Sequence, residues 1–345
     1  MNKDLYIKQQ AYLSEKLKDT TIIVSGATGL IGSRIVRYLF DLNDRCNARI
    51  KIIALYRNSD KKGSVYSDTT ERKDISYVLF NAEKNIEFDN GCDYIIHCAG
   101  VSGGSKMHLK DPIKLFEIGL NGTRLLLDYA VSHKCSGFVY ASTYEIYGEI
   151  NSDSLIKEDQ ACILDPLVLR NSYAEIKRLC ESLCVAYSSK YGINVFSGRL
   201  TSTLGTGVSY RDPRFFAEFA RCIIENRDIV LKSNGGTIRS YLDSDDAASA
   251  FLYLLVNGKS CNAYNLTNMN NVVSIREFAE KLISISGSEI DLRFDIANDI
   301  TATGYRKESC ILMDSSKLEA LGWKPVYSME DTLHKLLITM QKNSF

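Results

Sequence analysis

The sequence predicts an α/β protein with a doubly wound parallel sheet and a smaller C-terminal lobe. Apolar strand candidates alternate with helical patterns through the first two thirds of the 345 residues, which is typical of right-handed strand–helix–strand crossovers. A glycine-rich turn follows the first strand candidate. From about Gly205 onward, loops and short helices dominate. We therefore expect a lobe that closes over the carboxyl ends of the strands, where open α/β sheets bind ligands.

The elements follow from hydrophobic periodicity. The first twenty residues predict an amphipathic helix. Apolar runs predict strands at residues 21–25, 50–56, 94–98, 137–142 and 194–198. Helical spacing predicts helices around residues 33–41, 113–133 and 173–191. No third strand is placed in the stretch 59–90.

These elements predict three regions. We expect a helical extension over residues 1–20, a dinucleotide-binding domain over 21–204, and mainly a substrate-binding lobe over 205–345. Some segments of that lobe are expected to return to the large sheet. Residues 239–243 and 264–266 are expected as isolated extended pieces, and Asp245 or Asp246 as the cap of the next helix.

Composition excludes several classes of protein. The formal net charge is +0, so neither nucleic acid nor an anionic membrane surface is an expected partner. No apolar stretch approaches the ~18 residues of a membrane span, and the first twenty residues are too charged for a signal peptide. The ten cysteines are scattered without a Cys-x-x-Cys pair, which indicates thiols in a reducing cytoplasm and no metal site.

A glycine-rich turn joins the first strand to the following helix. Gly26, Gly29 and Gly32 recur every third residue directly after a β-branched run. Glycines let the backbone approach a pyrophosphate, and the helix N-terminus offers free N–H groups and a positive dipole end. The turn predicts a dinucleotide site.

A tyrosine and a lysine lie four residues apart in a predicted helix. Tyr173 and Lys177 therefore share one face, about 6 Å apart along the axis. A nearby ammonium favours the phenolate, so the tyrosine is predicted to act as a base below its usual pKa of about 10.

Several motifs occur in the order found in one family. They are Gly26-Ala27-Thr28-Gly29-Leu30-Ile31-Gly32, Ile96-His97-Cys98-Ala99-Gly100, Asn121-Gly122-Thr123, Tyr140-Ala141-Ser142-Thr143-Tyr144-Glu145-Ile146-Tyr147-Gly148, and the pair Tyr173 and Lys177. Together they resemble the extended short-chain dehydrogenase/reductase family, in its nucleotide-sugar epimerase/dehydratase branch. The resemblance covers roughly residues 21–323 and implies a Rossmann-type sheet.

The resemblance implies a site for NAD or NADP and a catalytic triad. The implied cofactor-binding residues are Gly26, Thr28, Gly29, Leu30, Ile31, Gly32, Arg57, Cys98, Ala99, Gly100, Asn121, Tyr173 and Lys177. Tyr173 would remove a proton from a sugar hydroxyl while the nicotinamide takes a hydride from the same carbon. Lys177 would hold the phenolate, and Thr143 would hydrogen-bond the reacting oxygen.

Glu145 is the candidate for a second proton transfer. On a continuing strand it would share a face with Thr143, and Thr143-Tyr144-Glu145 resembles the Thr-x-Glu of 4,6-dehydratases and of UDP-glucuronate decarboxylase. Tyr144 departs from dTDP-glucose dehydratases, which have an aspartate there, and this departure counts against that subtype.

The resemblance also implies substrate-binding residues. Arg239 and Arg306 resemble the arginines that clamp the substrate diphosphate. Ser202 stands where the family usually has an asparagine that contacts the nucleotide sugar. Arg57, helped by Arg34, follows the second strand where no acid is present, and this favours NADP over NAD.

The expected function is that of a nucleotide-sugar epimerase or dehydratase acting through transient oxidation by bound NAD(P). A UDP-glucuronate-type decarboxylase, an NADPH-dependent nucleotide-sugar ketoreductase and, from a different class, a non-catalytic dinucleotide sensor are the alternatives. The family resemblance implies a homodimer formed by the helices at 113–133 and 173–191.

Overall fold

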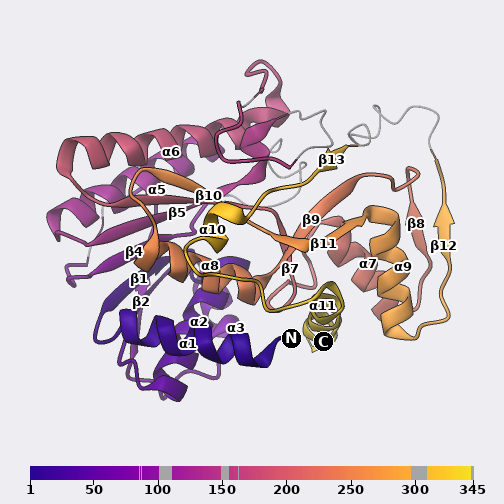
Figure 1. The fold of residues 1–345 in the computed structure, drawn as a ribbon, viewed down its shortest axis with the longest axis horizontal. Coiled ribbons are helices and arrows are strands. Elements are labelled where there is room, and N and C mark those ends of the chain that lie inside the picture. The colour runs from indigo at the N-terminus through magenta and orange to yellow at the C-terminus, as the bar shows by residue number, and fades with distance from the viewer. Residues whose placement is uncertain are drawn as a thin grey trace.

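A computed structural model describes residues 1–84, 86, 88–100, 111–148, 155–161, 163–296 and 309–342. Within these residues the chain forms two lobes, which lie side by side in Figure 1. The N- and C-terminal helices meet between them, where the Met1 ammonium lies 2.6 Å from the Asp331 carboxylate.

The larger lobe is built on a seven-stranded sheet in the order β10-β6-β5-β4-β1-β2-β3, and all its pairs are parallel. The strands are β1 (Thr21–Ser25), β2 (Lys51–Tyr56), β3 (Ile75–Leu79), β4 (Tyr94–His97), β5 (Gly137–Thr143), β6 (Val195–Leu200) and β10 (Asn262–Leu266). The strand order reverses between β1 and β4, which is where an open α/β sheet opens a ligand crevice at its carboxyl edge. The doubly wound parallel sheet predicted from the sequence is confirmed.

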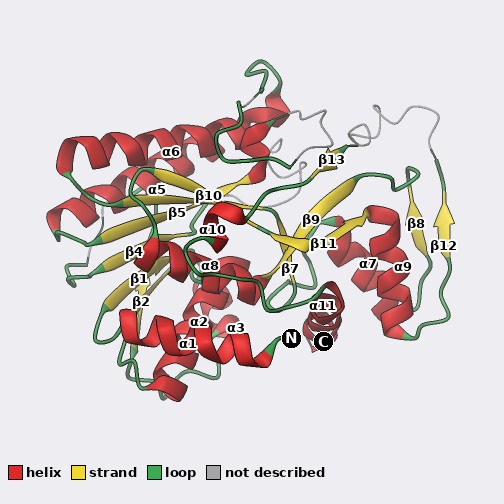
Figure 2. Cartoon of the chain, in the orientation of Figure 1, coloured by secondary structure: helices red, strands yellow, loops and turns green. Residues whose placement is uncertain are grey.

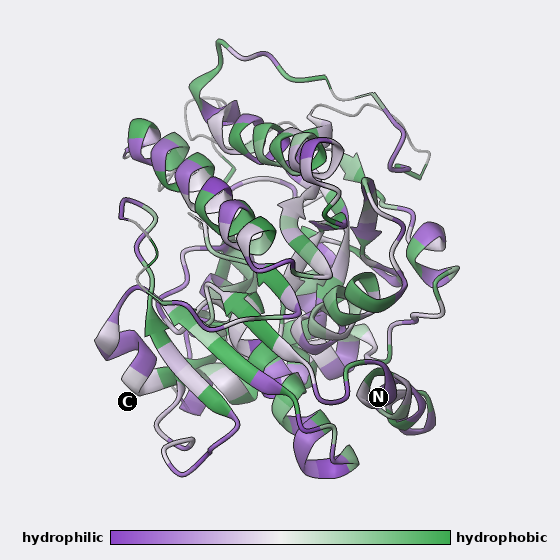
Figure 3. Ribbon diagram, turned by 90° about the vertical axis from the view of Figure 1, so that its left-hand side faces the viewer, coloured by the Kyte–Doolittle hydropathy of each residue, from purple (hydrophilic) through white to green (hydrophobic). Residues whose placement is uncertain are grey.

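Helices cover both faces of this sheet, as Figure 2 shows. One face carries α1 (Lys3–Lys16), α2 (Leu30–Cys46) and α8 (Ser244–Asn257), and the other carries α5 (Pro112–Ser132) and α6 (Ser172–Tyr191). Helices at the surface carry hydrophobic and hydrophilic residues in turn along their length (Figure 3), whereas α8 is buried over nearly its whole length. At Gly119 the helices α5 and α6 pack so closely that a Cβ atom would lie 2.7 Å from Ile176.

The smaller lobe has its own hydrophobic core. A four-stranded sheet contains β7 (Ser202–Leu204), β9 (Ile238–Asp243), β11 (Asn268–Ser274) and β13 (Cys310–Ile311), and β8 (Ile229–Leu231) pairs with β12 (Leu292–Phe294). The remaining described elements are α3 (Ser59–Val65), α7 (Phe215–Ile224), α9 (Ile275–Ser286), α10 (Ser316–Glu319), α11 (Met329–Lys342), and the 3₁₀ turns η1 (Tyr144–Tyr147) and η2 (Leu169–Asn171).

Two expectations about local structure are wrong, and one strand was left unplaced. The stretch 59–90 contains that strand, β3, which lacks fully buried residues because it forms the edge of the sheet. Residues 239–243 and 264–266 are not isolated, since they belong to β9, which pairs with β11, and to β10, which pairs with β6. Asp243, rather than Asp245 or Asp246, caps α8: β9 ends there, and its carboxylate accepts the Asp245 amide N–H at 2.8 Å.

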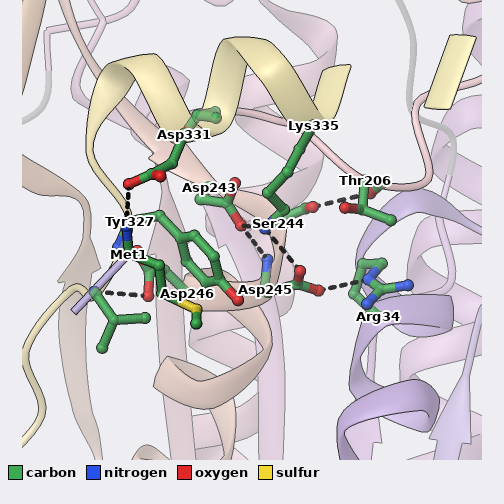
Figure 4. Close-up of polar contacts among 12 residues, drawn as sticks. Met1, Arg34, Thr206, Asp243, Ser244, Asp245, Asp246, Tyr327, Asp331 and Lys335 are labelled. Atoms are coloured by element: carbon green, nitrogen blue, oxygen red, sulfur yellow. Dashed lines mark hydrogen bonds and ion pairs between the residues drawn. The ribbon is translucent and has the colours of Figure 1, made fainter. Parts of the chain in front are cut away.

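A buried ionic network connects the two lobes (Figure 4). Lys335 of α11 donates to Asp243 at 2.5 Å and to Asp245 at 2.7 Å. Arg34 of α2 donates to the other oxygen of Asp245 at 2.5 Å. The helix that follows the glycine turn is thereby tied to the last helix of the chain.

Candidate active site

The glycine turn after β1 requires glycine at specific positions. Gly26 has φ +66°, and a Cβ atom there would lie 2.7 Å from the Ala99 backbone nitrogen. A Cβ atom at Gly32 would lie 2.3 Å from the Gly26 carbonyl oxygen. Gly29 is the N-cap residue of α2, so the free N–H groups at the start of this helix lie at the carboxyl edge of β1.

A chain of hydrogen bonds fixes the backbone opposite this turn. The Ala99 amide donates to the Ser25 hydroxyl at 3.1 Å, Ser25 and His97 Nδ1 are 2.6 Å apart, and His97 Nε2 and Thr123 are 3.1 Å apart. Thr123 donates its own proton to the Gly119 carbonyl at 2.7 Å. Thr123 therefore accepts from Nε2–H, and Nδ1 accepts from Ser25, so one neutral histidine tautomer satisfies every step.

Burial lowers the pKa of His97 to about 3, which keeps the ring in this neutral form. Ser25 was not singled out by the sequence, because a serine that ends a buried strand carries no spacing signal. His97 belonged to a quoted motif, but its hydrogen bonds to Ser25 and Thr123 could not be predicted from that motif. Thr123 belonged to a quoted motif, but its contacts required the packing of α5 on α6.

Cys98 and Gly100 flank Ala99 at the end of β4. Burial raises the pKa of the Cys98 thiol to about 12, so the thiol stays protonated at neutral pH. A Cβ atom at Gly100 would lie 3.6 Å from Lys177 Nζ. The lysine thus reaches the same crevice as the glycine turn.

Tyr173 and Lys177 lie on α6 next to the end of β5. Lys177 is buried and donates to the Ala141 carbonyl at 2.8 Å. Its Nζ atom lies 5.9 Å from the centroid of the Tyr173 ring. A hydrogen bond joins Tyr173 to Thr143, the last residue of β5. The three predicted triad residues are therefore brought together at the carboxyl edge of the sheet.

In the protein alone, the pKa of Tyr173 is not lowered as expected. Burial raises it first and the charge of Glu145 second, whereas the hydrogen bond from Thr143 and the charge of Arg214 lower it. Burial also lowers the pKa of Lys177. Proton loss from the phenol therefore depends on positive charge close to it.

The expectation that Glu145 continues a strand is wrong. β5 ends at Thr143, and Glu145 lies in the 3₁₀ turn η1, where its amide donates to the Thr143 hydroxyl at 3.3 Å. Its carboxylate forms an ion pair with Arg170 at 2.8 Å. The turn nevertheless keeps Glu145 near Tyr173, as its influence on that phenol shows. Arg170 was missed because no helical or strand spacing relates it to Glu145.

Arg239 of β9 reaches the same site from the smaller lobe. It donates to the Tyr144 hydroxyl at 3.4 Å. Several buried polar atoms have no hydrogen-bond partner among the described residues, and four of them belong to this region: Arg239 Nε, Arg170 Nη1, the Tyr241 hydroxyl and Glu145 Oε2. Buried polar atoms are normally paired, so these atoms are candidates for contacts with a polar ligand.

The other predicted site residues are placed less centrally. Ser202 is half-buried on β7 beside Tyr241, while Arg306 lies outside the described residues. Arg57 is exposed after β2. Arg34, which was expected to help Arg57, donates its Nε–H to Asp245.

The remaining predicted cofactor contacts line the turn and the neighbouring helix. Thr28, Leu30, Ile31 and Asn121 are all half-buried. In the described part of the chain no group of three or more His, Cys, Asp or Glu residues could hold a metal ion. Within those same residues, no helix is both long and apolar enough to span a membrane.

Comparisons with known proteins identify the family to which the chain belongs. The model of the NAD dependent epimerase/dehydratase family matches residues 22–267. Low-salt glycan biosynthesis protein Agl12 of Haloferax volcanii is 25% identical over 318 residues, which cover 90% of this chain and 96% of that protein. Human dTDP-D-glucose 4,6-dehydratase is 25% identical over 343 residues, which cover 93% and 90% of the two chains.

A solved structure has the same fold. UDP-glucuronic acid 4-epimerase of Bacillus cereus, determined with UDP-glucuronic acid and NAD, has a TM-score of 0.78 at 20% identity, with 93% of this chain and 99% of that chain covered. The family model spans well over half of the 345 residues and confirms the resemblance seen in the motifs. The chain is therefore an enzyme of the NAD-dependent epimerase/dehydratase family.

Proposed function

We propose that this enzyme converts a nucleotide-diphosphate sugar by transient oxidation of a sugar hydroxyl, with NAD(P) bound and recycled. The observation that carries the proposal is the meeting of Tyr173, Thr143 and Lys177 at the carboxyl edge of β5. Lys177 lies close to Gly100, on the segment that the glycine turn contacts at Ala99. Epimerases and dehydratases of this kind both begin with the oxidation of a sugar hydroxyl.

The roles follow from the geometry. Tyr173 is the base that removes the hydroxyl proton, and Thr143, bonded to it, orients the same oxygen. When bound, NAD(P) accepts the hydride from the carbon that carries this hydroxyl. Lys177 is anchored on Ala141 and supplies positive charge near the phenolate and the cofactor ribose. The ketone formed acidifies the neighbouring C–H bond, at which Glu145 is the candidate base.

The substrate end of the site suits an anionic ligand. Arg239 presents a buried Nε–H without a partner among the described residues, and a guanidinium matches paired phosphate oxygens. With Arg306 and Ser202 it would hold the diphosphate and the sugar. Arg170 and Arg239 together also suit a sugar carboxylate, which favours a UDP-glucuronate-type decarboxylase as the second candidate.

Exposed side chains support proposals for the cofactor and for the assembly. Arg57, at an exposed position after β2, suits the 2′-phosphate of NADP. A homodimer through α5 and α6 is supported by their exposed apolar side chains, Ile113, Phe116, Leu179 and Val185. The charged N-terminal helix fits a cytoplasmic enzyme.

One experiment tests the function. The purified protein is incubated with UDP-, dTDP-, GDP- and CDP-sugars in deuterated water without added NAD(P)H, and the products are analysed by mass. We expect conversion of one sugar with no net cofactor consumption. A dehydratase or decarboxylase product should carry carbon-bound deuterium, whereas a 4-epimerase, which returns the hydride to the same carbon, should incorporate none. A requirement for stoichiometric NADPH oxidation would support the ketoreductase instead. In the Glu145→Gln variant, ketone formation should persist while deuterium exchange at the neighbouring carbon is lost.

A further inference from the structure

Arg170 joins the two elements that carry the catalytic groups. It lies on η2, directly before α6 and three residues before Tyr173. Its Nη2 atom lies 2.8 Å from Oε2 of Glu145, which follows Thr143 on η1. The ion pair thus connects the end of β5 to the start of α6.

The pair is shielded from solvent. Only 28% of the Arg170 side chain and 16% of the Glu145 side chain are exposed. Charges in such surroundings are screened less than surface charges, and removing one partner leaves the other charge uncompensated. Removing Arg170 would therefore leave the Glu145 carboxylate without its ion-pair partner.

Glu145 acts on the phenol that must lose a proton. After burial, its charge is the largest influence that raises the pKa of Tyr173. The other groups that face this phenol are Thr143 of β5, Tyr144 of η1 and Arg214, besides Lys177 on its own helix. Glu145 is faced in turn by Arg170 and, from β9, by Arg239.

We propose that Arg170 is a positioning residue for the oxidation step: it holds the Glu145 carboxylate in an ion pair and offsets its charge, so that this carboxylate opposes proton loss from Tyr173 less than an unpaired one would. The inference rests on the proposed function. The site keeps the Glu145 carboxylate, the candidate base for the second proton transfer, close to the Tyr173 phenol, which must become anionic in the first. The ion pair with Arg170 reduces the electrostatic repulsion between these two groups.

The test is the pH dependence of hydride transfer in a single turnover, followed by the absorbance of the reduced nicotinamide. Arg170→Met should move the acidic limb of the rate profile upward by about one pH unit, which is roughly a tenfold slower rate at a fixed acidic pH. Arg170→Lys should return the acidic limb most of the way to its position in the unmodified enzyme. Arg170→Met combined with Glu145→Gln should also restore it, because both charges are then absent.

The matched control is Arg178→Met, which removes a partly exposed ion pair with Glu175, 3.4 Å apart on the same helix. This variant should leave the profile unchanged. An acidic limb that does not shift in Arg170→Met would overturn the proposal. So would a double variant in which hydride transfer is as slow as in the single variant. Melting temperatures and cofactor content show that each variant is folded. If the unmodified enzyme reduces no cofactor with any nucleotide sugar, the proposed function itself fails, and this inference with it.

Discussion

Because His97 is buried, the folding stability of this enzyme should fall at mildly acidic pH. Burial lowers the pKa of His97 to about 3, whereas an unfolded histidine has a pKa of about 6.5. Below about pH 6.5 the His97 imidazole binds a proton in the unfolded chain but not in the folded chain. The free energy of unfolding therefore falls as the pH drops from about 6.5 toward 3. At pH 5, about 1.5 units below the unfolded pKa, the free energy of unfolding is lower by roughly 2 kcal/mol, since one unit corresponds to ~1.4 kcal/mol.

The assay is urea unfolding of the enzyme and its His97→Gln variant at pH 7 and pH 5. The variant is expected to be less stable at both pH values, because the chain Ser25–His97–Thr123 is disturbed. The free energy that it loses between pH 7 and pH 5 should nevertheless be about 2 kcal/mol smaller than in the unmodified enzyme. Replacing the exposed His334 by Gln serves as the control. An equal pH dependence for the enzyme and the His97→Gln variant would refute the neutral buried histidine.

Two further perturbations test the connections around the glycine turn. Lys335→Met leaves the Asp243 and Asp245 carboxylates short of a cation in a buried network, and we expect a loss of about 3–5 kcal/mol in urea unfolding; a loss below about 1 kcal/mol would contradict the network's role. Gly26→Ala forces a Cβ atom to within 2.7 Å of the Ala99 nitrogen at a positive φ. The protein should then lose bound cofactor on gel filtration, and full cofactor occupancy would contradict the tight approach of these two segments.

Regular patterns in the sequence predict the sheet well. β1 agrees with the predicted strand at residues 21–25 because both of its faces are buried, which leaves a continuous apolar run. β3 was missed because an edge strand needs no such run. β10 was assigned to no sheet because its partner β6 lies more than sixty residues earlier in the chain.

In the candidate site, too, residues related by regular spacing were predicted, and residues that meet only through the fold were not. Tyr173 and Lys177 are found by helical spacing, since both lie on α6. Glu145 was placed on the wrong kind of element because the end of β5 is set by the Thr143 hydroxyl capping η1. Arg170 could not be found at all, because its partner is 25 residues away in sequence and the two meet only through the fold.

The central claim is that Tyr173 removes the proton in a hydride transfer to a recycled cofactor. The most direct measurement is stopped-flow absorbance of the reduced nicotinamide after mixing the holoenzyme with its nucleotide sugar, compared between the enzyme and Tyr173→Phe. The unmodified enzyme should show reduced nicotinamide that rises and then decays without net consumption. Tyr173→Phe should bind cofactor and substrate normally but lose this transient by a factor of at least ~100. A transient of unchanged rate in Tyr173→Phe would contradict the account.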